Sequence, residues 1–235
     1  MPGRGAVLPL VCATAFLAAC TEDAPPPEEP LSLERTAASL VRVGTRPAWI
    51  RSGDIDGDGV EELVVYSVAQ HRAGTVPYLE VFRREKGRWR RVFDATGNAP
   101  PGAGAPEQML IPPEEGFVSQ SVRRLRLVDF AGDGRPEIVA GIQNFGAGEG
   151  PLEVWILSME EDGSLTTEFY GSSSRGGDVV RILGNRVRFE FHVYRKDDPG
   201  CCPTFTDTVV IGWDEASGRI DVLERTRRPS GLGLG

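Results

Sequence analysis

The chain has 235 residues, of which 40% are hydrophobic, and a formal net charge of −8 at pH 7. This acidic balance argues against nucleic acids and anionic lipid surfaces as partners. The length allows one domain with a sizeable core, and 29 glycines and 18 prolines favour a turn-rich β protein over a helical one.

The N-terminal residues have the features of an export signal. Arg4 supplies a positive charge, and the apolar stretch that follows is too short to span a membrane. It ends in Leu17-Ala-Ala-Cys20, which resembles a bacterial lipobox. The resemblance implies that residues 1–19 are a lipoprotein signal peptide and that Cys20 becomes the lipid-modified first residue of an envelope protein. The alternative is an ordinary signal peptide in which the cysteine is coincidental.

Residues 20–47 are predicted to tether the domain to the membrane. Residues 21–30 are rich in proline and acids, which favour an extended, solvated chain. Leu33–Val43 is predicted to form a short helix, because its apolar residues share one helical face. Thr21 stands where inner-membrane lipoproteins of some Gram-negative bacteria have Asp, which favours the outer membrane over the inner one.

The remaining chain is predicted to be an all-β domain at 48–228, followed by a flexible tail at 229–235. Period-two alternation, β-branched runs and turn residues indicate three four-stranded antiparallel units, at about 48–93, 118–170 and 178–225. The expected strands are Ala48–Ser52, Glu62–Ala69, Tyr78–Arg84 and Arg88–Phe93; then Ser121–Asp129, Glu137–Gln143, Leu152–Met159 and Thr166–Tyr170; then Val179–Leu183, Arg186–Tyr194, Asp207–Trp213 and Arg219–Leu223.

An acidic, glycine-rich stretch, Asp54-Ile-Asp-Gly-Asp-Gly-Val-Glu-Glu62, separates the first two expected strands. Alternating Asp side chains converge when such a backbone coils, and clustered hard oxygens suit Ca²⁺. The predicted ligands of a structural Ca²⁺ are the side chains of Asp54, Asp56, Asp58 and Glu62 and the backbone carbonyl of Val60. The alternative is an acidic turn that is closed by its own hydrogen bonds and holds no ion.

This loop is not an EF-hand, because its twelfth residue is Val65 and an apolar strand follows it. The loop recurs 75 residues later, where Asp129, Asp133 and Glu137 stand at corresponding positions. Ala131 replaces one ligand there, which leaves only Asp129, Asp133 and Glu137 for a degenerate second metal loop, and a turn that holds no ion is the alternative. Recurrence of this kind is typical of stacked or radial β units.

The two loops and the strands after them resemble the FG-GAP/VCBS repeats, the calcium-loop repeats of integrin-α-like β-propellers. The resemblance covers about 54–93 and 129–170 and includes Leu79-Glu-Val-Phe82 and Leu152-Glu-Val-Trp155, at an offset of 73. It implies Ca²⁺-stabilised blades, most often in extracytoplasmic proteins, and no single activity. Three units are fewer than the about 4–8 blades of a closed ring. Closure would require propeller-like packing, added strands from residues 31–47, or self-association.

Cys201 and Cys202 are adjacent, and thiols outside the cytoplasm tend to oxidise. A vicinal disulfide that rigidifies their loop is predicted. The alternatives are a ligand-stacking surface and a pair of cysteines that is free or redox-active. His71 and His192 have no metal-ligand spacing, which argues against zinc.

The sequence shows no pairing of a nucleophile with a base, and nothing singles out two of its 34 acids as a glycosidase pair. The expected function is therefore a non-catalytic binding or scaffolding role in the cell envelope, with a protein or glycan partner. An extracytoplasmic polysaccharide-active enzyme and a purely structural lipoprotein are the alternatives.

Overall fold

The computed structural model describes residues 32–71, 74–94, 119–145, 149–160, 162–173, 176–199 and 202–230. All of them belong to the compact unit Leu31–Gly235. The predicted signal peptide 1–19, the lipidation site Cys20, the residues of the tether before Ser32, and Cys201 lie outside the described residues. The predictions made for them therefore stay predictions.

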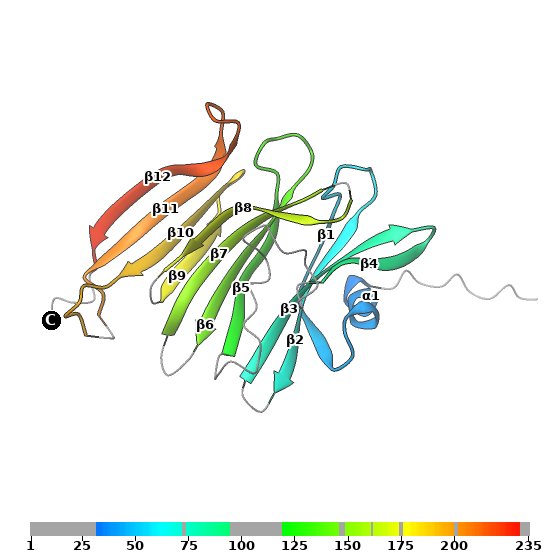
Figure 1. Cartoon of the computed structure of the whole chain (residues 1–235), viewed down its shortest axis with the longest axis horizontal. Coiled ribbons are helices and arrows are strands. Elements are labelled where there is room, and N and C mark those ends of the chain that lie inside the picture. Colours follow the sequence, from blue (N-terminus) through cyan, green and yellow to red (C-terminus); the bar gives the residue numbers. More distant parts are fainter. Residues whose placement is uncertain are drawn as a thin grey trace, which may run out of the picture. The chain divides into compact units, whose positions relative to one another are not determined.

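Twelve strands and one helix are found in the described part of the chain, and the strands form three antiparallel sheets of four (Figure 1). Each sheet takes four consecutive strands, and none closes on itself within the described residues. The first sheet contains β1 (Thr45–Gly53), β2 (Glu62–His71), β3 (Gly74–Glu85) and β4 (Arg88–Asp94); the second contains β5 (Ser119–Val128), β6 (Glu137–Phe145), β7 (Glu149–Met159) and β8 (Leu165–Ser172); the third contains β9 (Gly177–Ile182), β10 (Arg186–Val193), β11 (Phe205–Asp214) and β12 (Arg219–Pro229).

The predicted all-β class and the three four-stranded units are confirmed. The alternation of β10 shows why the sequence specifies these strands. Val187, Phe189 and Phe191 point to one side and are buried, while the charged and polar residues between them point to the other. One face of this strand therefore belongs to a core and the other carries charge.

The second sheet packs on both of its faces, which explains its long apolar runs. On β6, Ile138, Ala140 and Ile142 share a core with Val64 and Tyr66 of the first sheet. The residue between the first two, Val139, belongs to another core that includes apolar residues of the third sheet. A strand that is buried on both faces reads as a continuous apolar run instead of an alternation.

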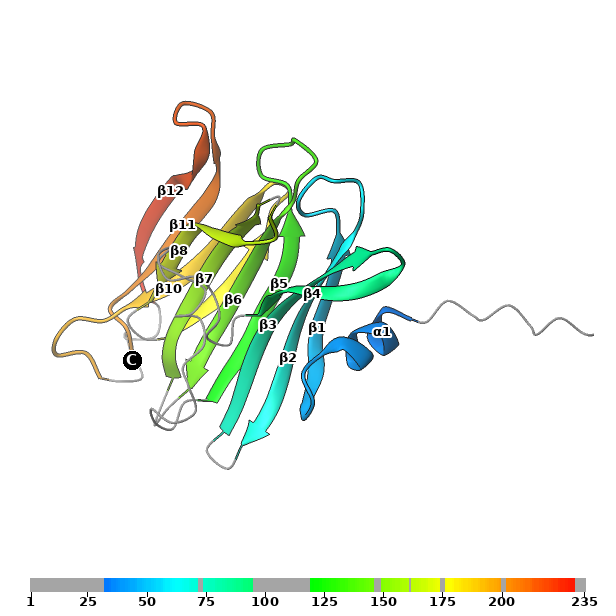
Figure 2. The same cartoon turned by 45° about the vertical axis from the view of Figure 1, so that its right-hand side comes forward.

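The helix α1 (Leu33–Leu40) covers the other face of the first sheet, where Ala37 packs with Leu63 and Phe82 (Figure 2). Ser32 caps its N-terminus by accepting a hydrogen bond from the backbone N–H of Arg35. The predicted helix is confirmed, and it ends three residues earlier than predicted. Within residues 32–47 the structure contains this helix and the beginning of β1, and no additional strand.

The register of the third strands differs from the sequence alignment of the repeats. Leu79 pairs with Tyr66, and the residue 75 positions after Tyr66, Gly141, pairs with Val154. Leu79 therefore corresponds to Val154, at the same offset of 75 that relates the two loops. The alignment of the two Leu-Glu-Val motifs at an offset of 73 is wrong by two residues, because cross-strand pairing decides the register.

The last strand is longer than predicted. β12 continues to Pro229, and the backbone N–H of Ser230 donates to the carbonyl of Thr204 at 3.0 Å. The extension is held by two arginines of β12, Arg225 and Arg227, which both bind the buried carboxylate of Asp207. Pro229 and Ser230, which were predicted to belong to the tail, are therefore held against the third sheet, and residues 231–235 lie outside the described residues.

No helix in the described part of the chain combines the length and apolar character that a bilayer-spanning segment needs.

Candidate metal site

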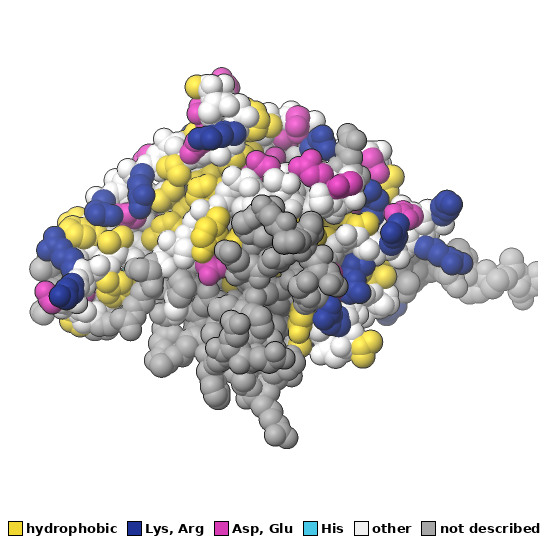
Figure 3. All heavy atoms as spheres, viewed as in Figure 1, with side chains coloured by type: hydrophobic (Ala, Val, Ile, Leu, Met, Phe, Trp, Pro, Cys, Tyr) yellow, Lys and Arg dark blue, Asp and Glu magenta, His cyan; other side chains and the backbone are white. Residues whose placement is uncertain are grey.

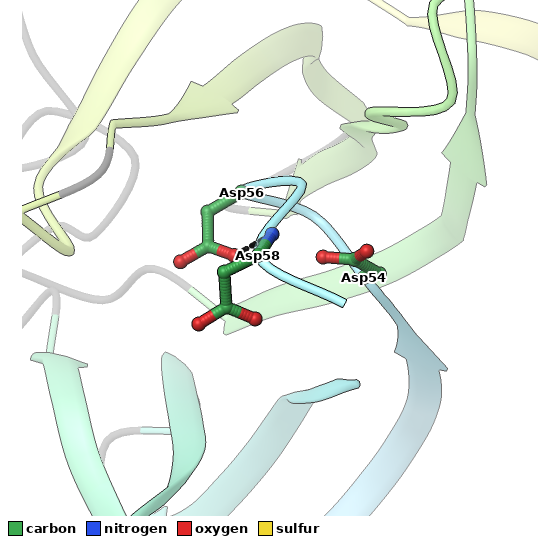
Figure 4. Close-up of side chains that lie close together, drawn as sticks. All are labelled: Asp54, Asp56 and Asp58. Atoms are coloured by element: carbon green, nitrogen blue, oxygen red, sulfur yellow. Dashed lines mark hydrogen bonds between the residues drawn. The ribbon is translucent and has the colours of Figure 1, made fainter. Parts of the chain in front are cut away.

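The first acidic loop connects β1 to β2 and brings together three of the predicted ligands. Oxygens of Asp54, Asp56 and Asp58 lie within 4.8 Å of one another (Figure 4). The coil depends on Gly57 and Gly59, whose φ angles of 77° and 86° are in the left-handed region that favours glycine. The predicted convergence of the three side chains is therefore present.

Each of the four predicted ligand carboxylates is oriented by a backbone hydrogen bond to one of its oxygens. The donors are the N–H groups of Gly59 to Asp54 at 3.0 Å, of Asp58 to Asp56 at 3.2 Å, of Val60 to Asp58 at 2.8 Å, and of Ile55 to Glu62 at 3.0 Å. These bonds leave the remaining carboxylate oxygens for other partners.

Two of those remaining oxygens are buried without a hydrogen-bond donor. They are Oδ1 of Asp54 and Oε1 of Glu62, and the side chain of Glu62 is 0% exposed. Burial raises the pKa of Glu62 to about 7, the backbone N–H of Ile55 opposes the shift, and the charges of Asp58 and Asp54 add to it. Buried carboxylate oxygens without donors are unfavourable unless a cation neutralises them.

The donor set fits Ca²⁺, which prefers several carboxylate and carbonyl oxygens in an adaptable geometry. Asp54, Asp56, Asp58 and Glu62 would hold the ion, and it would neutralise the charge that accumulates between the ends of β1 and β2. That the backbone carbonyl of Val60 is also a ligand stays a prediction. No other group of three or more His, Cys, Asp or Glu residues with this proximity occurs within the described ranges.

A residue that the sequence analysis missed also contacts the site. The guanidinium of Arg83, from β3, donates through Nη2 to Oδ2 of Asp56, and its Nε lies 3.5 Å from Oε1 of Glu62. β3 pairs with β2 so that Phe82 is opposite Leu63, which brings Arg83 beside Glu62. Only the strand register could have identified it, because Arg83 is separated from the loop by the whole of β2.

The second loop, between β5 and β6, has the same backbone conformation as the first loop, but its carboxylates have different hydrogen-bond donors. Oδ1 of Asp129 accepts N–H groups from Gly132 at 2.6 Å and Asp133 at 3.2 Å, and its Oδ2 accepts from Gly134 at 2.9 Å. Oε2 of Glu137 accepts from Phe130 at 3.2 Å. Three N–H donors therefore already satisfy both oxygens of Asp129.

The two loops lie near each other. A Cβ atom added to Gly57 would lie 2.8 Å from Cγ of Arg135, which belongs to the second loop. On the face that Figure 3 shows, Asp and Glu side chains gather along the upper edge, where both loops are drawn in the same view of Figure 1. The first loop thus supports the contact between the first and second sheets.

The roles predicted for the cysteines and histidines stay predictions. Cys202 is half-buried, and its predicted partner Cys201 lies outside the described residues. His192 is half-buried on β10, and nothing is described of the side chain of His71 on β2.

A comparison with protein-family models gave no match, and a comparison with curated proteins gave none at a significant level. The resemblance to FG-GAP/VCBS repeats therefore stands on the residues of the two loops and the strands that follow them.

Proposed function

We propose that the protein is a lipid-anchored envelope lipoprotein whose β domain is stabilised by one structural Ca²⁺ and has a non-catalytic binding or scaffolding role. The observation that carries the metal assignment is the first loop. Three Asp side chains converge there beside a fully buried Glu62 oxygen that accepts no hydrogen bond.

The ion would act on the fold and not on a substrate. Its ligands come from one stretch of nine residues that begins directly after β1 and ends on the first residue of β2. Binding there would hold the two strand ends together and fix the backbone on which Arg135 packs. An ion bound by the folded state alone stabilises that state by mass action.

Calorimetry and thermal melting of the purified full chain in detergent test the metal. We expect heat of Ca²⁺ uptake, a lower melting temperature in EDTA and its recovery with Ca²⁺. Asp56→Ala should remove most of this response, whereas Asp133→Ala should leave it largely intact, since Asp129 already has three donors. Absence of Ca²⁺ uptake by the unaltered chain would refute the metal assignment.

The membrane anchor is supported by the lipobox-like sequence that ends at Cys20. Labelling with palmitate in a bacterial host tests it. Cys20→Ser should abolish the label and release the protein from membranes, whereas Cys12→Ser, within the predicted signal peptide, should change neither. Label retained in the Cys20 variant would refute the assignment.

The proposed partner is an envelope protein or glycan. Affinity purification of the native lipoprotein from its own envelope, in parallel with a glycan array, separates the two classes. Hydrolysis of envelope polysaccharides by the purified chain would favour the catalytic alternative instead. Binding in neither assay would favour a purely structural lipoprotein.

A further inference from the structure

Arg83 is the one cationic side chain that bonds to the cluster of the first loop among the described ion pairs. Its Nη2 donates to Oδ2 of Asp56, and its Nε lies 3.5 Å from Oε1 of Glu62. The side chain of Arg83 is 16% exposed and those of its partners are 2% and 0% exposed. A guanidinium in this position partly neutralises carboxylates that water does not reach.

The same two oxygens are needed by a metal ion. Glu62 can offer Oε1, since its Oε2 already accepts the N–H of Ile55. Asp56 can offer Oδ2, since its Oδ1 accepts the N–H of Asp58. Arg83 therefore bonds to or lies beside the oxygens that are left for a cation, and two positive charges at one buried position repel each other.

The second unit provides an internal comparison. In the first sheet Phe82 lies opposite Leu63, and in the second sheet Leu157 lies opposite Ile138. The residue after each of these partners is therefore equivalent, so Ser158 stands at the position of Arg83. Ser158 donates to Glu168 at 2.6 Å and does not reach the second loop in the described contacts. The second loop also has Ala131 in place of Asp56. The acid and the arginine are thus present together in one unit and missing together in the other.

We propose that Arg83 is a built-in counter-ion of the first loop, and that a divalent cation binds by taking Asp56 and Glu62 from it. The inference rests on the proposed Ca²⁺ site and adds how that site is regulated. Arg83 holds the loop together when metal is absent, and it weakens the affinity for the ion. The folded domain then survives low Ca²⁺, and the site fills only when Ca²⁺ is abundant.

The charge of Arg83 can be removed while most of its length is kept, with Arg83→Gln. Arg84→Gln is the matched control, because Arg84 is the next residue on β3, is exposed and changes the net charge equally. The full chain in detergent is titrated with CaCl₂ in a calorimeter and is melted in EDTA. We expect Arg83→Gln to bind Ca²⁺ about tenfold more tightly, a usual size for coupling between two ligands. It should also melt several degrees lower in EDTA, and the control should do neither.

Arg83→Lys keeps the positive charge at this position and removes the shape of the guanidinium. Because the charge is kept, this variant should bind Ca²⁺ with the affinity of the unaltered chain. Unchanged or weaker Ca²⁺ binding by Arg83→Gln would overturn the proposal, because Arg83 would then position the ligands instead of competing for them.

A double-mutant cycle in EDTA makes the test independent of metal. If Arg83 and Asp56 form the counter-ion pair, Asp56→Ala combined with Arg83→Gln should be more stable than the sum of the two single effects predicts, because the second change no longer leaves an unpaired charge. Additive losses would overturn the counter-ion role. If the unaltered chain takes up no Ca²⁺ but the cycle is non-additive, the metal assignment fails while the counter-ion role of Arg83 stands.

Discussion

The first and second acidic loops have the same backbone conformation and a glutamate at the same position, but their aspartates have different hydrogen-bond partners. Gly57 and Gly59 have φ angles of 77° and 86°, and Gly132 and Gly134 have 75° and 88°. In both loops the terminal Glu accepts the N–H of the second loop residue. The first Asp differs: Oδ1 of Asp54 is buried without a donor, whereas Oδ1 of Asp129 accepts two N–H groups.

This difference indicates that the conformation of the turn does not depend on the full set of acidic side chains. The second loop reaches the same positive glycine φ angles with Ala131 where the first has Asp56. The first loop has two more acids, Asp56 and Glu61, and it leaves two buried carboxylate oxygens without donors. The first loop therefore leaves buried carboxylate oxygens that a cation would neutralise, whereas both oxygens of Asp129 in the second loop already have backbone donors.

The largest expected effect is a difference in Ca²⁺ binding between variants of the two loop glutamates, Glu62 and Glu137. Glu62→Gln should remove most of the stabilisation by Ca²⁺, which at a hundredfold excess over the dissociation constant amounts to about 2.7 kcal/mol. The reason is that a neutral amide replaces a buried anionic ligand. Glu137→Gln should leave the Ca²⁺ titration unchanged. Calorimetry of both variants measures this, and equal losses would contradict the assignment of the metal to the first loop.

A smaller effect concerns the glycines at equivalent positions. Gly57→Ala and Gly132→Ala each place a side chain at positive φ, which costs about 1–2 kcal/mol. A Cβ at Gly57 would also lie 2.8 Å from Arg135, whereas one at Gly132 meets nothing within 4 Å. Chemical denaturation should therefore show the greater loss for Gly57→Ala. An equal loss would mean that Arg135 moves aside without cost.

The pH dependence of the metal-free protein should also respond to these glutamates. Burial raises the pKa of Glu62 and of Glu137 to about 7 in each case. A folded-state pKa above the unfolded value means that the stabilisation is complete below about pH 4.5 and is lost as pH rises through 7.

Melting in EDTA across this range should show that decline, and Glu137→Gln should reduce its slope, because an amide does not titrate. An unchanged slope in the variant would show that Glu137 is not the group that titrates. In the presence of Ca²⁺, affinity should instead rise as pH passes 7, because the metal requires the ionised form of Glu62.

The smallest expected effect is a gain in the second loop. Ala131→Asp restores the missing acid, so it should add a weak second Ca²⁺ equivalent in calorimetry. Affinity should stay well below that of the first loop, because Oδ1 of Asp129 keeps its two backbone donors. A second equivalent as tight as the first would show that these donors do not compete with the metal.

Much of the fold could be predicted from local patterns in the sequence. All twelve strands overlap their predicted positions, and α1 begins at the predicted residue, Leu33. Alternation, β-branched runs and glycine turns act over a few residues, so a short window contains the information. The same holds for the convergence of Asp54, Asp56 and Asp58, which one loop supplies.

The tertiary structure decided what depends on contacts across strands and sheets. The position of Arg83 beside Glu62, the register that relates Leu79 to Val154, and the extension of β12 all require pairing between distant segments. Sequence patterns specify which face of a strand is apolar, but not which strand or sheet will cover it. For the same reason, the sequence alone could propose a cation for the first loop but could not show that an arginine already lies against it.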